Sequence, residues 1–326
     1  MSSLDGILNR LSDGQFHSGE ILASELNVTR AAVWKQLKKL ESMGLRVDAV
    51  RGKGYRLQQP LELLNADSIL ILLPSSVKSV MSDLVVHTAI DSTNRYLLQQ
   101  GSVDSRSGQI CLAERQTRGR GRRGRQWVSP FGSNIYLSLL WHFEKGPAHL
   151  AGLSLALGVA VIRVLSAYVT EGMGLKWPND IYIKEKKLGG ILVEISGETH
   201  GPCTLVAGVG LNILMNDSSG AIIDQPWISL QDVINDKTIS RNAIAAELIE
   251  QMLLVLQSYP EQGFSRYKQE WQKWDIMQNK PVFIVSIDGE KPGVAKGVDD
   301  EGNFLLQTEN GIEIIHSGEV SLRLQA

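Results

Sequence analysis

The chain has 326 residues and a formal net charge of -2, and it contains two cysteines. This length exceeds a typical single domain of about 100 to 200 residues, so two or three domains are expected. Two cysteines, Cys111 and Cys203, are too few for a disulfide framework, and the start of the chain lacks a secretory signal pattern, so a reduced, cytoplasmic protein is expected.

Positive charge is concentrated in two segments. Residues 29–56 hold eight Lys or Arg against two acids, and residues 115–125 hold six Arg against none. Each segment carries +6 within a chain of -2, which leaves -14 for all other residues. The basicity is therefore local, and it predicts two separate anionic partners.

The first sixty residues predict three short helices and a hairpin. Apolar residues recur at helix spacing, Asn27 or Thr29 is placed to cap the third helix, and Gly44 ends it. Residues 45–57 alternate around a turn at 52–54, which is typical of a wing. A plain helical subdomain is the alternative, but the basic residues favour a winged helix-turn-helix. We expect DNA contacts from Thr29, Arg30, Trp34, Lys35, Lys38, Lys39, Arg51 and Lys53.

The remainder predicts an α+β fold with a mixed sheet, because apolar strands and helices follow one another without strict alternation. The apolar run at 152–165 is too short to span a bilayer and predicts a buried helix, so no membrane partner is expected. From about residue 280, short strands alternate with turns. The expected domains are a winged helix-turn-helix (1–63), a linker (64–83), a catalytic domain (84–275) and a C-terminal SH3-like β-barrel (276–326).

The stretch GRGRRGR at 119–125 predicts a loop, because alternating glycine makes a helix costly. Two interpretations are open at this point. Short Arg/Gly runs are typical of flexible or nucleic-acid-binding tracts. Alternatively, glycine lets the backbone approach an anion while arginine binds its carboxylate or phosphate.

Three motifs bear on this choice: DSTN (91–94), ERQTRGRGRRGRQW (114–127), and KWPND (176–180) leading into KKLGGILVE (186–194). In that order and spacing they closely resemble the biotin–protein ligases. With a winged helix-turn-helix in front, the chain resembles the bifunctional type that also represses biotin-synthesis genes. The resemblance covers essentially the whole chain and favours the anion-binding interpretation of the loop.

The resemblance implies a reaction in two steps. Biotin and MgATP give biotinyl-5'-adenylate and pyrophosphate, and a lysine of a biotin carboxyl carrier protein then takes the biotinyl group. Biotin, ATP and Mg²⁺ are the implied ligands. The implied partners are the carrier protein, operator DNA and, when biotinyl-AMP is bound, a second copy of the chain.

The resemblance also implies residue roles. Lys187, Asp180 and Arg122 are the implied catalytic residues, and whether Asp180 acts as a base or a metal ligand stays open, with no metal site of the protein's own expected. Arg118 stands where a small residue is expected, so its effect on loop closure is also open. Biotin contacts are implied for Ser92, Thr93, Gln116, Arg120, Arg122, Lys187, Gly208 and Gly210. ATP contacts are implied for Arg120, Arg122, Arg125, Lys187, Asn212 and Trp227.

Three rival functions remain at this stage. A lipoate ligase shares the adenylating logic, but the pair of GRGRRGR and KWPND weighs against it. A transcription factor that only senses biotin would not need Lys187 and Asp180. An RNA-binding protein is disfavoured because no aromatic residue lies among the arginines to stack on bases.

Overall fold

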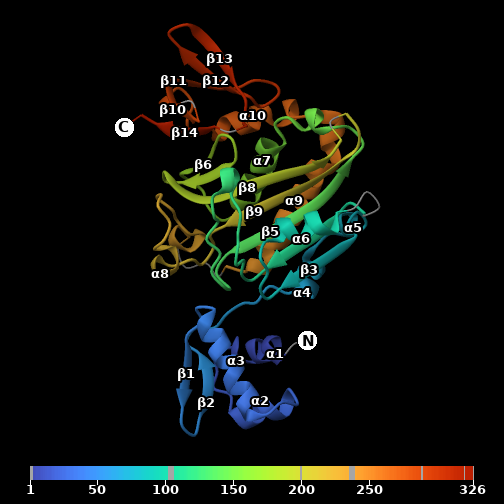
Figure 1. Ribbon diagram of the computed structural model, residues 1–326, viewed down its shortest axis with the longest axis vertical. Coiled ribbons are helices and arrows are strands. Elements are labelled where there is room, and N and C mark those ends of the chain that lie inside the picture. The colour runs from blue at the N-terminus through green and yellow to red at the C-terminus, as the bar shows by residue number, and fades with distance from the viewer. Residues whose placement is uncertain are drawn as a thin grey trace.

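The computed structural model describes residues 3–101, 106–198, 200–234, 239–287, 289–318 and 320–325. Three parts follow one another along the long axis (Figure 1). The N-terminal domain stands at one end, the central domain with its large sheet lies in the middle, and a small β domain lies at the other end. An α+β fold with a mixed sheet is confirmed.

The N-terminal domain is a winged helix-turn-helix. Thr29 caps the third helix by accepting a hydrogen bond from the amide of Ala32 at 3.2 Å, and Gly44, with φ +94°, follows its end. The antiparallel wing pairs Val47 with Leu57 and Val50 with Gly54. The elements are α1 (Ser3–Leu11), α2 (Gly19–Glu25), α3 (Arg30–Ser42), β1 (Val47–Val50) and β2 (Gly54–Leu57).

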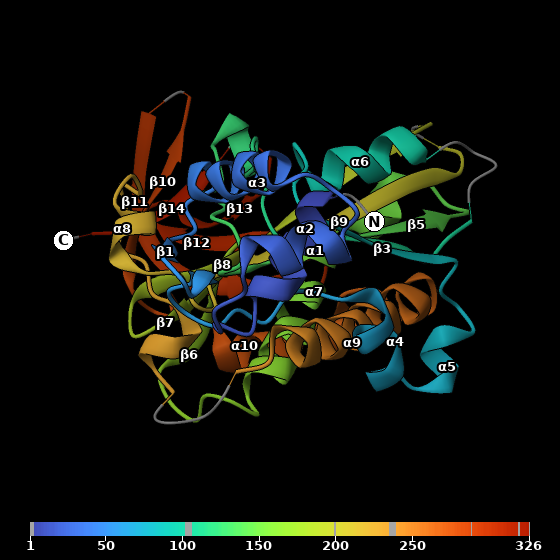
Figure 2. The same cartoon turned by 90° about the horizontal axis from the view of Figure 1, so that it is seen from below.

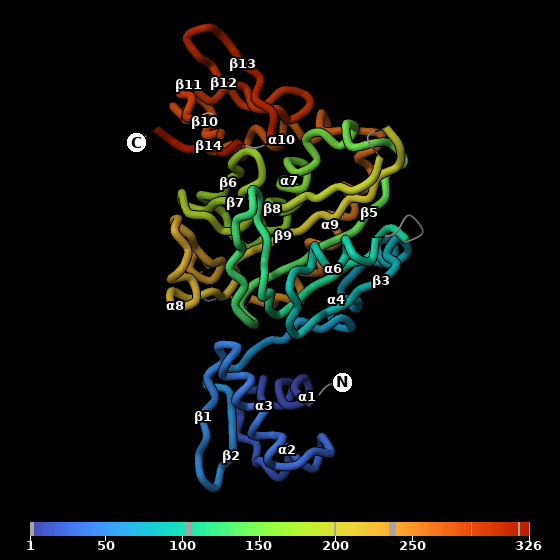
Figure 3. Tube along the Cα trace, viewed as in Figure 1, coloured from blue at the N-terminus to red at the C-terminus, as the bar shows by residue number. Residues whose placement is uncertain are grey.

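A side chain of the central domain completes the core of the N-terminal domain. Phe131 is 5% exposed and belongs to the same apolar cluster as Leu8 and Leu37. A Cβ on the neighbouring Gly132 would lie 2.9 Å from Leu61, so the connecting segment packs tightly there. The tube trace follows this segment between the two domains (Figure 3). The N-terminal domain is thus docked on the central domain, not merely tethered to it.

Residues 64–83 are not the expected linker. They form α4 (Ala66–Leu72) and α5 (Ser75–Lys78), and Ile69, Leu73 and Val77 are buried in the core of the central domain. The apolar spacing of these three residues is that of a helix face, which needs an apolar partner. Helix α4 finds that partner on α9 (Arg241–Gln262).

The central domain is built on a seven-stranded mixed sheet in the order β3-β4-β5-β9-β8-β7-β6. Only β3 and β4 run parallel; the other neighbours are antiparallel. The strands are β3 (Asp83–His87), β4 (Gln109–Ala113), β5 (Ile135–Phe143), β6 (Met173–Lys176), β7 (Asp180–Ile183), β8 (Lys186–Gly197) and β9 (Cys203–Leu211).

Helices cover the two faces of this sheet unequally. Figure 2 shows α4, α7 and α9 on one face and α6 on the other, so part of the second face is left for loops. The expectation that the apolar run is too short to span a bilayer does not hold, because the helical stretch 147–165 is longer than the predicted 152–165 and is long and apolar enough to cross a membrane. However, 67% of its apolar 18-residue window is buried, and α7 is a core helix as expected. The remaining elements are α6 (Thr93–Gln100), α7 (Leu153–Leu165), α8 (Asp217–Gly220), α10 (Ser265–Trp274) and the 3₁₀ helices η1 (Arg122–Gly124), η2 (Pro147–Leu150) and η3 (Leu230–Asp232).

The C-terminal domain has the expected short antiparallel strands, and no pairing that would close them into a barrel is found among the described residues. Its antiparallel order is β13-β12-β11-β10-β14, and within the described residues its two edge strands do not pair. Alternating strands and turns in a sequence fix the strands but not whether the edges meet, and β14 pairs with β10 alone. The strands are β10 (Pro281–Ser286), β11 (Gly289–Val298), β12 (Phe304–Thr308), β13 (Gly311–Ile315) and β14 (Ser321–Leu324).

Candidate active site

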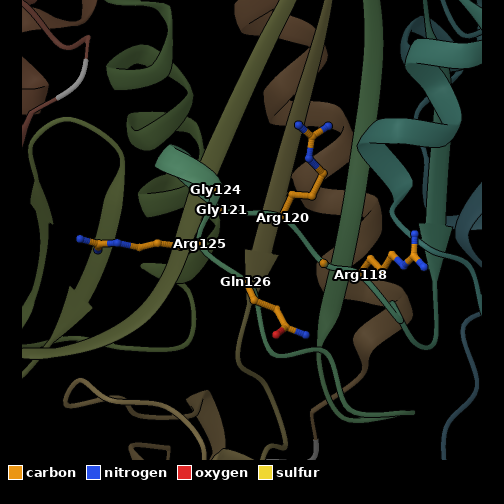
Figure 4. A pocket seen from close by; sticks show the side chains of 7 residues that line it. Arg118, Arg120, Gly121, Gly124, Arg125 and Gln126 are labelled. Carbon is orange, nitrogen blue, oxygen red and sulfur yellow. The ribbon is translucent and has the colours of Figure 1, made fainter.

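The arginine-rich segment is a folded loop between β4 and β5. The amide of Gly121 donates to the carbonyl of Arg125 at 2.7 Å, and the amide of Trp127 donates to the carbonyl of Gly119 at 2.9 Å. Arg123, within the short helix η1, has φ +57°, a backbone conformation that residues other than glycine rarely adopt. Figure 4 shows Arg118, Arg120 and Arg125 pointing away from one another. The loop is therefore held by its own backbone while its arginines reach different neighbours.

Two of these arginines have definite partners. Arg120 forms an ion pair with Glu194 on β8 at 2.9 Å, and Glu194 also accepts a hydrogen bond from Asn94 at 2.9 Å. Arg122 donates to the carbonyl oxygens of Ser317 and Gly318, the second at 2.7 Å. The loop therefore connects the central sheet to the C-terminal domain. Glu194 ends the motif KKLGGILVE, but no role was predicted for it, because the motif does not show that this carboxylate meets Arg120.

Lys187 and Asp180 come together through the β7–β8 hairpin. The two strands pair in antiparallel register, and the Nζ of Lys187 lies 2.8 Å from Oδ1 of Asp180. Both side chains are mostly buried, with exposed fractions of 13% and 20%. The same Nζ lies 5.7 Å from the ring centroid of Trp127, at the end of the arginine loop. The hairpin thus brings the expected lysine and carboxylate together and places them beside the loop.

More positive charge gathers around this pair. Lys176, opposite Asp180 in the β6–β7 register, has its Nζ 5.2 Å from the ring of Tyr182. Burial lowers the pKa of Lys176, and Asp180 opposes that shift. Burial likewise lowers the pKa of Arg122, again opposed by Asp180. Lys176 opens the motif KWPND, although the sequence predicts no role for it. One carboxylate among several cations suits a ligand with several negative charges.

A second group of polar side chains lies at the start of α6. The amide and hydroxyl of Thr93 donate to Oε1 of Gln116 at 2.9 and 3.1 Å, and Nε2 of Gln116 donates to Ser129 at 3.2 Å. Ser138 donates to the Thr93 hydroxyl at 2.7 Å. Ser92 caps α6 by accepting from the amide of Arg95. The expected residues are therefore adjacent, and two lone serines that no motif marks complete the group.

The expected glycines of β9 make room for side chains. A Cβ on Gly208 would lie 2.1 Å from Oδ1 of Asn94, and one on Gly210 would lie 2.6 Å from Cε2 of Trp127. Neither strand position tolerates a side chain, because these neighbours already fill the space. The buried Nε1 of Trp127 lacks a hydrogen-bond partner among the described residues, which leaves one donor available beside the Lys187 pair.

Trp227 lies beside Lys187 through backbone pairing. The amide of Lys187 donates to the carbonyl of Pro226 at 3.0 Å, and the amide of Ile228 donates to the carbonyl of Lys187 at 3.1 Å. Asn212 is 3% exposed, and its side-chain amide donates to the carbonyl of Ile228 at 3.3 Å. Asn212 thus holds the segment that carries Trp227. Arg125, the remaining residue expected to contact ATP, is exposed on the arginine loop.

Comparison with known proteins agrees with this arrangement. Residues 86–212 match the biotin/lipoate A/B protein ligase family, 4–56 match an HTH domain and 279–323 match the biotin protein ligase C terminal domain. The bifunctional ligase/repressor BirA of Salmonella typhimurium is 41% identical over 97% of this chain and 96% of its own length. The chain belongs to the biotin protein ligase family. Its HTH match places it with the members that carry this domain.

Two further relatives agree with this membership. BirA of Escherichia coli strain K12 is 41% identical over 96% of this chain and 95% of its own. Among solved structures, the biotin protein ligase from Aquifex aeolicus in complex with biotin and ATP superposes with a TM-score of 0.63 and 29% identity. That structure covers 75% of this chain and 100% of its own. The match therefore reaches about three quarters of this fold.

The matched HTH region, residues 4–56, contains the basic segment 29–56. On α3, Arg30 forms an ion pair with Glu20 at 3.1 Å and Lys38 one with Glu41 at 2.7 Å, all four side chains being well exposed. Trp34, Lys35 and Lys39 are exposed on the same helix. On the wing, Arg51 is exposed, and Lys53 has its Nζ 5.8 Å from the ring of Phe16. The expected DNA-contacting side chains therefore reach solvent from the helix and the wing.

Proposed function

We propose that the protein forms biotinyl-5'-AMP from biotin and ATP, transfers biotin to a lysine of a biotin carboxyl carrier protein, and represses biotin-synthesis genes. The observation that carries the ligase activity is the Lys187–Asp180 pair beside the arginine loop. The relatives' names support both activities, since two relatives that are 41% identical over nearly the whole chain are bifunctional ligase/repressors. A cytoplasmic location is part of this proposal, because ATP and operator DNA would both be met there.

In the first step a carboxylate oxygen of biotin attacks the α-phosphorus of ATP, and pyrophosphate leaves with the bridging oxygen. Both reactants are anions, so their mutual repulsion must be neutralised. We assign this task to Lys187, Arg120 and Arg122, with Arg125 at the pyrophosphate side. A mostly buried ammonium stabilises developing negative charge more strongly than an exposed one.

In the second step the amine of the acceptor lysine attacks the carbonyl carbon of the adenylate, and AMP leaves. The amine must lose a proton, and Asp180 is the carboxylate at hand. Asp180 is equally suited to assist Mg²⁺, which prefers oxygen ligands and is commonly shared with substrate phosphates. Within the described ranges no cluster of three His, Cys, Asp or Glu side chains gathers. Mg²⁺ would therefore be held mainly by the ATP phosphates, and Asp180 would serve either as the base of the second step or as one protein ligand of the ion.

Biotin recognition is assigned to the polar group at the start of α6. A ureido ring offers two N–H donors and a carbonyl acceptor, which the hydroxyls of Ser92, Thr93 and Ser129 and the amide of Gln116 can satisfy. Gly208 and Gly210 act indirectly, by admitting Asn94 and Trp127 into this region. Trp227, with its backbone held by Asn212, is assigned to the adenine ring.

The decisive experiment is incubation with biotin, ATP, Mg²⁺ and a biotin carboxyl carrier domain, followed by mass measurement of the domain. The acceptor is expected to gain one biotinyl group. A parallel incubation with lipoate tests the rival substrate that the family's name includes. Transfer of lipoate without transfer of biotin would overturn the proposal in favour of lipoate ligation.

Replacing Arg122 with glycine is expected to let biotinyl-AMP escape. The substitution removes both a cation near Asp180 and the hydrogen bonds to Ser317 and Gly318 that hold the loop on the C-terminal domain. Released adenylate should then acylate lysines of bystander proteins, which mass spectrometry detects. Arg123→Gly makes the same charge change at an exposed neighbour and should release none. An Arg122→Gly protein that labels no bystanders would remove this arginine from the assignment.

Operator binding is expected to be tightest with biotin plus ATP. One winged helix neutralises few phosphates, whereas a homodimer places two of them on two half-sites. Biotinyl-AMP would order the arginine loop, and this change can reach the N-terminal domain through one short segment. Gln116 is hydrogen-bonded to Ser129, and Phe131, two residues further on, lies in the core of the N-terminal domain. The dimer and the acceptor domain should compete for the protein.

Mobility-shift and sedimentation titrations at fixed salt measure this coupling. Ligand should increase both operator affinity and dimer, unbiotinylated carrier domain should reduce them, and affinity should fall steeply as salt rises. Equal operator affinity with and without biotin and ATP would contradict the coupling while leaving the ligase activity untouched.

A further inference from the structure

Trp34 on α3 is an exposed aromatic residue that the ligase chemistry does not use. Its relative exposure is 56%, whereas tryptophan side chains are mostly buried in folded proteins. The residue before it, Val33, is 1% exposed, and Leu37, one turn further on, is 3% exposed. The helix therefore turns its apolar face inward and presents Trp34 to solvent on the adjoining face. Burial in the domain core does not explain a tryptophan here.

The surroundings of Trp34 are positively charged. The Nζ of Lys38 lies 5.8 Å from the centroid of the indole ring, close enough for a cation–π contact that steadies the ring against the helix. Lys35 and Lys39 are exposed on the same helix. Figure 1 shows α3 between the other two helices and the wing, so the helix and the wing belong to one surface. The indole ring of Trp34 is therefore an exposed apolar surface surrounded by lysine side chains.

We propose that Trp34 is a specificity-determining residue that contacts thymine methyl groups in the major groove of the operator. This inference rests on the proposed repressor function. Residues in the first turns of a recognition helix face base edges, and Trp34 is the fifth residue of α3. The thymine 5-methyl group is the apolar feature that the major groove offers, and apolar side chains contact it.

The neighbouring cations have a different task. Lys35, Lys38 and Lys39 meet phosphates, which fix the position of the helix but carry no sequence information. An indole ring carries no charge and no acceptor, and apart from its single N–H donor its surface is apolar. Trp34 thus contacts a base, and the lysines contact the DNA backbone. Base modification should affect the contact of Trp34, and salt should affect the contacts of the lysines.

Deoxyuridine replacement separates these contributions. Duplexes are first selected from a random pool on the full-length protein with biotin and MgATP, and each thymine of the selected site is then replaced in turn by deoxyuridine. For the unsubstituted protein, at least one replacement should weaken binding about fourfold, the effect of burying one methyl-sized group. In Trp34→Ala the same replacement should have no effect, while the salt dependence stays unchanged.

Two further variants complete the experiment. Trp34→Phe keeps an apolar ring and should retain part of the methyl dependence, whereas Lys35→Ala should keep all of it and reduce the salt slope by about one. Circular dichroism and adenylation checks confirm that each protein is folded. Methyl dependence that persists in Trp34→Ala, or a loss of dimer without a change in base preference, overturns the inference. Failure to select any duplex overturns the repressor function itself and the inference with it.

Discussion

Replacing Lys187 with alanine is expected to slow biotin-dependent ATP–pyrophosphate exchange by about a thousandfold. The Nζ of Lys187 is mostly buried, lies 2.8 Å from Asp180 and faces the ring of Trp127, so water has limited access to screen its charge. Removal of one such preorganised charge stabiliser typically costs two to three orders of magnitude in rate. The measurement is exchange of labelled pyrophosphate into ATP without any acceptor protein.

The adjacent lysine provides the matched control. Lys186 opens the same strand but is exposed, so Lys186→Ala should exchange pyrophosphate at nearly the normal rate. Biotin binding should survive in Lys187→Ala, because the polar group at Thr93 and Gln116 is built without this lysine. Unchanged exchange in Lys187→Ala would exclude the residue from catalysis, and equal losses in both variants would point to the strand and not to the charge.

Local patterns predicted much of the fold. Thr29 was one of two possible caps for the third helix, and the structure confirms it, because a cap depends on residues three positions apart. The hairpin that brings Asp180 to Lys187 is equally local, because a short turn joins two consecutive strands. These features arise from neighbours in the chain, which a single sequence displays directly.

Long-range pairing was not predictable in the same way. Glu194 pairs with Arg120, and Phe131 enters the core of another domain, although nothing local to either residue indicates its partner. Closure of the C-terminal strands into a barrel is a similar case, because it depends on strands at opposite edges. The segment 64–83 looked like a linker, but its apolar face is buried against a helix that begins more than 150 residues later. Such contacts depend on topology, which composition does not encode.

A buried ion pair unites several of these distant elements. Arg241, at the start of α9, is 0% exposed and pairs at 2.8 Å with Glu114, whose side chain is 4% exposed. The guanidinium also donates to the carbonyl oxygens of Glu62 and Asn134, and Glu114 accepts from the amide of Leu64. The pair thus holds the segment that leads from the N-terminal domain against the start of the arginine-loop segment.

Arg241→Met is accordingly expected to destabilise the central domain by about 3 to 5 kcal/mol, because it leaves the Glu114 carboxylate buried without its countercharge. Glu114→Gln should destabilise for the corresponding reason. The double variant Glu114→Leu, Arg241→Met removes both charges and should recover most of the loss, since an apolar pair needs no compensation. Thermal and urea unfolding measure the stability of the central domain, and limited proteolysis measures release of residues 58–65.

Arg163→Met is the control, because its ion pair with Glu270 is partly exposed and exposed pairs contribute about 1 kcal/mol or less. If Arg241→Met proves no more harmful than Arg163→Met, the Arg241–Glu114 pair does not hold the domains together.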